Sequence, residues 1–199
     1  IDHVDSLAVA DVDGDGRFEV AASNAASLFD ARTGELLWQH PELVHHGQQL
    51  RVVKVREDVD GQQILIRAAK NGAVLIFSAA GDLLERLDHG GMLCPLQWSG
   101  NGLHQIALRD VIFDGWGNRV ATLPIGEAAG ESGHSFPPPD PESWGHTMTC
   151  DVDGDGLEEV IGISKMCLAV FENPDPPKEP DGVKRTPEYW LDVANTTRY

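Results

Sequence analysis

Two loops of the sequence carry nearly the same ten residues, with acidic side chains spaced to bind a metal ion. Residues 11–20 read DVDGDGRFEV and residues 151–160 read DVDGDGLEEV. Carboxylates at the first, third, fifth and ninth positions and a backbone carbonyl at the seventh offer oxygens to one hard cation, and Ca²⁺ accepts about 6–8 of them. We predict two structural calcium sites with the ligands Asp11, Asp13, Asp15, the carbonyl of Arg17 and Glu19, and Asp151, Asp153, Asp155, the carbonyl of Leu157 and Glu159.

These loops differ from EF-hands, which need a bidentate glutamate at the twelfth position and a helix on either side. The twelfth position is Ala22 in the first loop and Gly162 in the second, and the flanking residues form short apolar runs of strand character. Two Asp-Gly hairpin turns without a metal are the alternative interpretation. We expect the loops to close strand-to-strand turns and to take no part in chemistry.

Histidines supply candidates for acid–base chemistry. The segment HHGQQLR at residues 45–51 holds two imidazoles, two amides and a guanidinium, and DHGG at residues 88–91 places an imidazole beside a carboxylate. An imidazole ionises near neutral pH and is the commonest general base. His45, His46 and His89 are therefore the candidate catalytic residues, and a solvated or hydrogen-bonding histidine in a turn is the alternative for each.

A further set of side chains could bind a substrate. Lysine and arginine can neutralise a carboxylate, and exposed tryptophans can stack on a sugar ring. One tryptophan lies in a DGWGN turn and another in a segment rich in Gly and Pro, whereas charges that point outwards from a strand are the alternative for the arginines. The candidates are Arg51, Arg67, Lys70, His146, Trp116 and Trp144.

The strand–turn–strand unit around the first acidic loop recurs along the chain. Weaker copies without the aspartate triplet occupy residues 51–69 and 94–110, and the four copies are aligned by Val20, Ile64, Ile106 and Val160. Further strand-like runs around a Gly-containing turn follow, and no segment shows a sustained helical period. Four short strands in a repeat of about 40 residues are typical of a β-propeller blade.

We therefore predict an all-β chain whose residues 1–173 form four four-stranded propeller blades, at about 1–40, 47–87, 91–124 and 145–173. Residues 126–144 are expected to be a loop insertion, and residues 174–199 a Pro-rich linker with a strand-like tail. Because four blades leave sheet edges open, we expect a seven- or eight-bladed propeller with further blades N-terminal to this chain. The repeat places His3, His46, His89 and His146 before or at the start of the innermost strands, where they would converge on one face.

The acidic repeats resemble a known family. HVDSLAVADVDGDGRFEV at residues 3–20 and GHTMTCDVDGDGLEEVIG at residues 145–162 resemble the calcium-binding FG-GAP or VCBS-type repeats of β-propellers. With LFDARTGELLWQ at residues 28–39 and VIFDGWGNRVATLP at residues 111–124, they are similar to the C-terminal half of rhamnogalacturonan lyases and the related ulvan lyases.

This resemblance implies β-elimination on an acidic, uronate-containing polysaccharide. A base would remove the proton next to the uronate carboxylate, and a cation, arginine or lysine would hold the carboxylate charge. The cleft around the propeller axis is where such a family would bind its substrate. A non-catalytic calcium propeller that binds glycans or proteins is the alternative, and a purely structural repeat domain of a surface protein is the third hypothesis.

Composition limits the classes of partner. The 199 residues are 41% hydrophobic, and no apolar stretch approaches the length of a membrane span. A net charge of −17 argues against nucleic acid or an anionic membrane surface as the partner. Three cysteines permit at most one disulfide. The chain opens with Ile, as a mature product or an excised piece would, and we expect a secreted, periplasmic or cell-surface bacterial protein.

Overall fold

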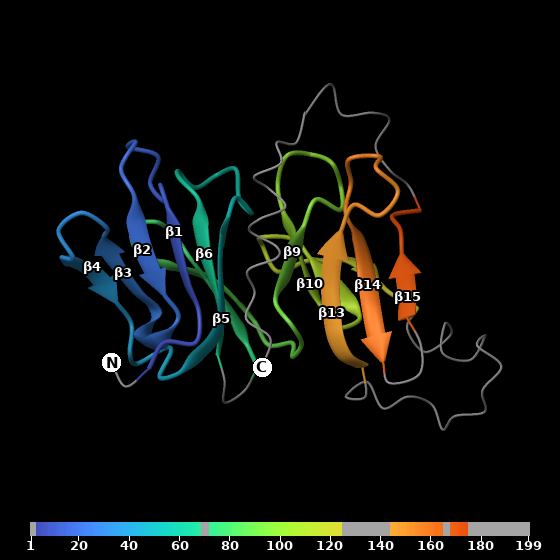
Figure 1. Cartoon of the computed structure of the whole chain (residues 1–199), viewed down its shortest axis with the longest axis horizontal. Helices are drawn as coiled ribbons and strands as arrows, with labels where there is room; N and C mark the ends of the chain where they lie inside the picture. Colours follow the sequence, from blue (N-terminus) through green and yellow to red (C-terminus); the bar gives the residue numbers. More distant parts are fainter. Residues whose placement is uncertain (1–2, 69–71, 125–143, 165–167, 175–199) are drawn as a thin grey trace.

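The described residues form an all-β structure, which confirms the all-β part of the predicted fold class. The computed structural model describes residues 3–68, 72–124, 144–164 and 168–174. These residues form fifteen β-strands and one short 3-10 turn, Asn24–Ala26, with no α-helix among them (Figure 1). None of the described residues therefore belongs to a helix long and apolar enough to cross a membrane.

The strands form four antiparallel sheets, each built from strands that follow one another along the chain. Sheet 1 contains β1 (Leu7–Ala10), β2 (Glu19–Ala22), β3 (Ser27–Asp30) and β4 (Leu36–Gln39). Sheet 2 contains β5 (Gly47–Val53), β6 (Gln63–Ala68), β7 (Val74–Phe77) and β8 (Leu83–Leu87). Sheet 3 contains β9 (Cys94–Leu96), β10 (Gln105–Leu108), β11 (Val111–Phe113) and β12 (Arg119–Thr122). Sheet 4 contains β13 (Trp144–Cys150), β14 (Glu159–Ser164) and β15 (Leu168–Phe171).

The fourth sheet differs from the sequence prediction in two respects. It has three strands within the described residues, where four were expected. Its first strand begins at Trp144, so this residue lies in β13 and not in the predicted loop insertion, because its backbone pairs with Ser164 of β14. The rest of the predicted insertion, residues 126–143, lies outside the described residues, as do residues 175–199 of the predicted tail.

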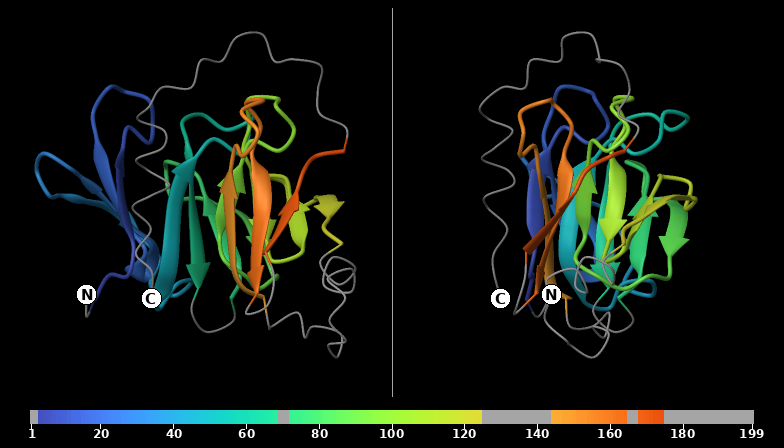
Figure 2. Two further views of the ribbon diagram at one scale, coloured as in Figure 1. Left: turned by 45° about the vertical axis from the view of Figure 1, so that its right-hand side comes forward. Right: turned by 90° about the vertical axis from the view of Figure 1, so that its right-hand side faces the viewer.

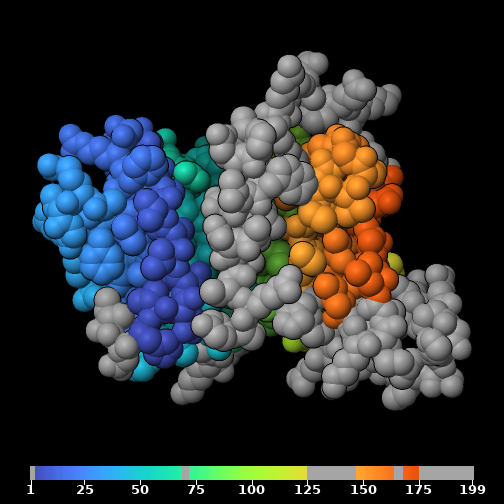
Figure 3. Space-filling model, viewed as in Figure 1, coloured from blue at the N-terminus to red at the C-terminus, as the bar shows by residue number. Residues whose placement is uncertain are grey.

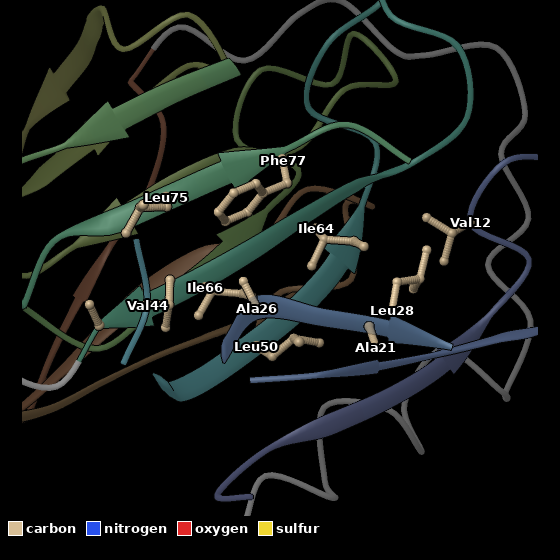
Figure 4. Close-up of a cluster of buried hydrophobic side chains, with 11 residues drawn as sticks. Val12, Ala21, Ala26, Leu28, Val44, Leu50, Ile64, Ile66, Leu75 and Phe77 are labelled. Atoms are coloured by element: carbon tan, nitrogen blue, oxygen red, sulfur yellow. The ribbon is translucent and has the colours of Figure 1, made fainter. Parts of the chain in front are cut away.

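Three apolar cores lie between successive sheets. The first joins sheets 1 and 2 through side chains such as Leu28, Ile64 and Phe77 (Figure 4). The second joins sheets 2 and 3, and the third joins sheets 3 and 4 around Ile112 and Val160. The two central strands of sheet 2 read ILIRA and VLIF and are buried on both faces, because a core lies on either side of that sheet.

The end sheets, in contrast, leave apolar side chains in solvent. In β1, Ala8 and Ala10 pack on the first core, while the alternating residues Leu7 and Val9 remain 63% and 59% exposed. In sheet 4, Leu168 is 64% exposed and Met148 of β13 is 41% exposed. Parts of β1 and β13 lie on the surface seen in Figure 3. The outer faces of sheets 1 and 4, the first and last sheets of the row, therefore both carry exposed apolar side chains.

The first strands of sheets 1 and 2 contact each other, as do those of sheets 3 and 4. β1 contacts β5, and β9 contacts β13 (Figures 1 and 2). Both acidic loops, which connect β1 to β2 and β13 to β14, lie at the same end of the sheets, at the top of Figure 1. The segments that lead into β1 and β5 lie at the opposite end. The predicted metal ligands of the acidic loops are therefore well separated from His3 and His46.

Candidate functional site

The segments that lead into β1 and β5 bring two histidines onto one aspartate. His46 Nε2 lies 2.9 Å from one carboxylate oxygen of Asp5, and His3 Nε2 lies 3.0 Å from the other. The two imidazole rings meet edge to face, with their centroids 4.7 Å apart. We call His3, Asp5 and His46 the histidine cluster. One ligand-type atom from each of them lies within 4.8 Å of the others, so the cluster has the geometry of an acid–base group or of a metal site.

Backbone contacts among three segments hold the histidine cluster together. Ser23, which follows β2, donates its N–H to the carbonyl of Ser6 at 2.9 Å, and its Oγ accepts the N–H of Ser6 at 3.2 Å. The segment that carries Asp5 is thereby fixed to the end of β2. Gly47, which opens β5, approaches Ser23 so closely that a Cβ would lie 2.2 Å from the Ser23 carbonyl oxygen. This close approach sets His46 beside Asp5.

The histidine cluster is open to solvent and has a free nitrogen. The side chains of His46 and Asp5 are 36% and 31% exposed, and that of His3 is 61% exposed. Since Nε2 of His46 is bonded to Asp5, Nδ1 is left for a bound molecule, and the described residues offer it no hydrogen-bond partner. Asp5 can fix the ring orientation and stabilise an imidazolium, as an orienting carboxylate does for a catalytic histidine.

Arg67 is the candidate cation nearest to this cluster along the sheet. It belongs to β6, where Ala68 pairs with Gly47 and Arg67 pairs with Gln49. Its Nη1 donates to Gln48 Oε1 at 2.6 Å, and its Nε is buried without a hydrogen-bond partner among the described residues. Burial lowers the pKa of its guanidinium, because the charged form loses hydration. An anion bound here would supply the missing partner.

The other predicted site residues are distributed over several places. Arg51 lies in the middle of β5 and donates from Nη1 to the carbonyl of Leu50 at 2.7 Å. His45 is exposed next to His46. The backbones of Trp144 and His146 lie in β13, and Lys70 falls outside the described residues.

His89 lies apart from the histidine cluster, in a pocket between sheets 2 and 3. Its Nε2 is 3.2 Å from Asp110 Oδ1, and its ring lies against Phe113 with centroids 5.5 Å apart. Trp116 lines the same pocket. The structure therefore separates two histidines that the sequence offered as alternatives, and it pairs each with a different aspartate.

Asp5 is the member of the candidate site that the sequence interpretation missed. His3 was singled out only by its place before a strand. The spacing of His3 and Asp5, two residues apart in a segment before a strand, was the available signal. It carries little information, because the partner that makes it meaningful, His46, comes from another sheet.

The two acidic loops have the same pattern of side-chain to backbone hydrogen bonds. In the first, Asp11 accepts the N–H groups of Gly14 at 2.8 Å and Gly16 at 3.0 Å, while the buried Glu19 accepts that of Val12 at 2.8 Å. The second loop repeats these bonds from Asp151 and Glu159 at 2.7–3.1 Å. Asp13 and Asp15 each accept the N–H two residues further on, as do Asp153 and Asp155 in the second loop.

The last carboxylate of each acidic loop lies in an unfavourable electrostatic environment. Glu19 is 6% exposed and Glu159 is 4% exposed. Burial raises the pKa of both carboxyl groups, and repulsion from the three aspartates of the same loop raises it further. A backbone hydrogen bond to each carboxylate offsets part of this rise in pKa. Carboxylate oxygens of Asp11, Asp13 and Asp15 lie within 4.8 Å of one another. These potential metal ligands are crowded, negatively charged oxygens, which suit a hard divalent cation.

The fold itself is shared with rhamnogalacturonan lyases. The chain matches the structure of rhamnogalacturonan lyase YesW with a TM-score of 0.61 and 18% sequence identity, over 96% of this chain and 33% of that one. It matches the Bacillus licheniformis rhamnogalacturonan lyase with a TM-score of 0.55 and 16% identity, over 87% of this chain and 29% of that one. No family model and no curated protein matches the sequence. The chain spans about a third of the length of these lyases and has the fold of that part of them.

Proposed function

We propose that this chain is the calcium-stabilised part of a polysaccharide lyase that cleaves uronate-containing glycans of the rhamnogalacturonan or ulvan type by β-elimination, with His46 as the base. The observation that carries the proposal is the pairing of His46 and His3 with Asp5. Arg67, on the neighbouring strand β6, is partly buried and its Nε has no hydrogen-bond partner among the described residues. The fold shared with rhamnogalacturonan lyases supports the choice of reaction.

Each group in this mechanism has one role. Nδ1 of His46 takes the proton from the carbon next to the uronate carboxylate, and Asp5 stabilises the resulting imidazolium through Nε2. Arg67 pairs with the carboxylate on which negative charge develops. The electron pair of the broken C–H bond forms the double bond of the product, and the glycosidic oxygen leaves and takes a proton from solvent. Arg51 is the second candidate for holding the carboxylate.

Calcium is proposed as a structural ion at the two acidic loops. When bound, it would neutralise the carboxylates that crowd around Glu19 and Glu159 and so fix the turns between β1 and β2 and between β13 and β14. The loops lie at the end of the sheets opposite to the histidine cluster, so the ion takes no part in the elimination.

The four sheets are proposed to be blades of a larger propeller. Each sheet is a meander, the first strands meet in sheets 1 and 2 and in sheets 3 and 4, and an apolar core joins every successive pair of sheets. The exposed apolar faces around Leu7 and Leu168 need a covering, and further blades that precede this chain would supply it. A secreted or surface location agrees with a polymeric substrate.

An assay for unsaturated uronide products tests the proposal. Purified protein is mixed with rhamnogalacturonan, ulvan and pectate in calcium buffer, and the ultraviolet absorbance of the new double bond is followed. We expect His46→Ala and Asp5→Asn to lower the rate at least 100-fold, since a general base contributes about 10²–10⁴. His45→Ala is the matched control, because it removes an exposed neighbouring imidazole.

Two outcomes would overturn the proposal. No product on any substrate from folded protein would favour the non-catalytic glycan-binding alternative. Equal losses from His45→Ala and His46→Ala would show that the Asp5 contact does not select the base.

A further inference from the structure

The pocket between sheets 2 and 3 is built around an immobilised tryptophan. It is lined by residues of β8, of the segment after it, and of the β11–β12 hairpin, namely Glu85, Arg86, Leu87, Asp88, His89, Phe113, Trp116, Gly117 and Arg119. Trp116 is 37% exposed, although most large apolar side chains of sheet 3 are buried. An exposed aromatic ring offers an apolar face on which a sugar ring can stack, and polar groups that converge beside it can orient the ligand.

The turn that carries Trp116 is held by one carboxylate. Asp114 Oδ1 accepts the N–H groups of Trp116 at 2.9 Å and of Asn118 at 2.8 Å, and its Oδ2 accepts the Asn118 side chain at 2.9 Å. A Cβ on Gly115 would lie 2.3 Å from the carbonyl oxygen of Val55, so the turn is pressed against sheet 2. The tryptophan backbone is therefore fixed without a ligand.

The indole itself is contacted by an arginine of the loop between β5 and β6. The guanidinium of Arg56 lies over the Trp116 ring, 5.2 Å from its centroid, in a cation–π contact. Asp58 is ion-paired with Arg56, and its pKa is lowered first by that arginine and also by the Trp116 side chain. One side of the ring is thereby covered, and the exposed remainder belongs to the pocket. Such a platform loses little conformational entropy when a sugar stacks on it.

The charged side chains of the pocket lining indicate whether a neutral or an acidic sugar would bind. Arg86 is ion-paired with Asp88, with Nε 2.8 Å from Oδ1, and the Glu85 carboxylate accepts the N–H of Arg86 at 2.8 Å. Arg119 is exposed at the start of β12, where its backbone pairs with Phe113, and among the described residues its guanidinium has neither an ion pair nor a hydrogen bond. It is the one arginine of the pocket lining whose guanidinium is available to a ligand carboxylate.

We infer that this pocket is a second, non-catalytic binding site for an acidic saccharide unit. The sugar ring stacks on Trp116, its carboxylate pairs with Arg119, and His89 bonds to a hydroxyl. The inference shares with the proposed function only the class of glycan. A site of this kind, away from the histidine cluster, would hold a polymeric substrate on the enzyme between cleavage events.

Binding measurements on a catalytically silent background test the inference. Isothermal titration calorimetry of the His46→Ala protein uses a short oligogalacturonate, with a neutral malto-oligosaccharide of the same length as a comparison. We expect Trp116→Ala and Arg119→Gln, each added to His46→Ala, to weaken oligogalacturonate binding at least tenfold. Trp116→Phe should retain most of the affinity. Arg32→Gln is the matched control, because Arg32 is an exposed arginine in the β3–β4 turn of sheet 1.

The results separate this inference from the proposed function. Unchanged affinity in both Trp116→Ala and Arg119→Gln would overturn it, and so would equal binding of the neutral oligosaccharide. Weakened binding by a protein with no lyase activity in the wild type would keep the inference and reject the proposed reaction. Because Arg119 is on the surface, its variant remains informative if Trp116→Ala fails to fold.

Discussion

The glycine that opens β5 offers a stringent test of how the histidine cluster is assembled. A Cβ on Gly47 would lie 2.2 Å from the Ser23 carbonyl oxygen and 2.8 Å from Ile66 Cγ2, whereas ordinary contacts lie at 3.4–4 Å. The closest neighbour is backbone, which cannot rotate away as a flexible side chain would. In Gly47→Ala the start of β5 and the end of β2 must therefore separate by roughly 1 Å or more.

This separation has a calculable cost. Overpacking of a close contact costs about 1–3 kcal/mol, and each kcal/mol lowers the Tm of a protein of this size by about 2–4 °C. We expect Gly47→Ala to melt about 2–12 °C below the wild type in thermal unfolding followed by circular dichroism. The same movement draws His46 away from Asp5, so the imidazole signals of His46 should shift in NMR spectra and the proposed lyase activity should fall.

Gly34→Ala is the matched control for this substitution. Gly34 lies in the β3–β4 turn with φ +73°, and a Cβ there would meet nothing within 4 Å. Its replacement strains only the left-handed backbone, at about 1–2 kcal/mol, and should leave the His46 signals unchanged. A Gly47→Ala protein that melts at the wild-type temperature would refute the reasoning. Equal changes at His46 in the two variants would refute it as well.

Three further predictions concern other parts of the molecule. Equilibrium dialysis should find one bound calcium ion fewer in Glu19→Gln and in Glu159→Gln, but not in Glu35→Gln. At a calcium concentration of 100 times the Kd, each occupied site should add about 2.7 kcal/mol to the free energy of unfolding. A wild-type protein that binds no calcium would contradict this prediction. Burial raises the pKa of the Cys94 thiol to about 12, so little reactive thiolate is present at pH 8. Iodoacetamide should therefore label Cys94 only after unfolding, as mass spectrometry can show. Rapid labelling of the native protein would contradict this prediction. Arg56→Ala should broaden the Trp116 indole N–H signal, whereas Arg32→Ala should not.

The strands and the acidic loops could be predicted from the sequence because their determinants are local. Apolar runs separated by Gly-containing turns define the strands. The hydrogen bonds from backbone N–H groups to the carboxylates of Asp11 and Glu19 span only three to seven residues along the chain. The local DGWGN turn likewise marked Trp116 as a candidate ligand contact. The assignment of Trp144 to a loop was wrong, because composition does not reveal that its backbone pairs with Ser164.

The histidine cluster and the pocket between sheets 2 and 3 required the tertiary structure. His46 and Asp5 are 41 residues apart and belong to segments that lead into different sheets. Their contact depends on the approach of Gly47 to Ser23, which no local pattern encodes. By itself, the sequence determined which side chains could do chemistry and which strands carry them. The packing of one sheet on the next decided which of those side chains meet, because contacts between sheets join residues that are remote along the chain.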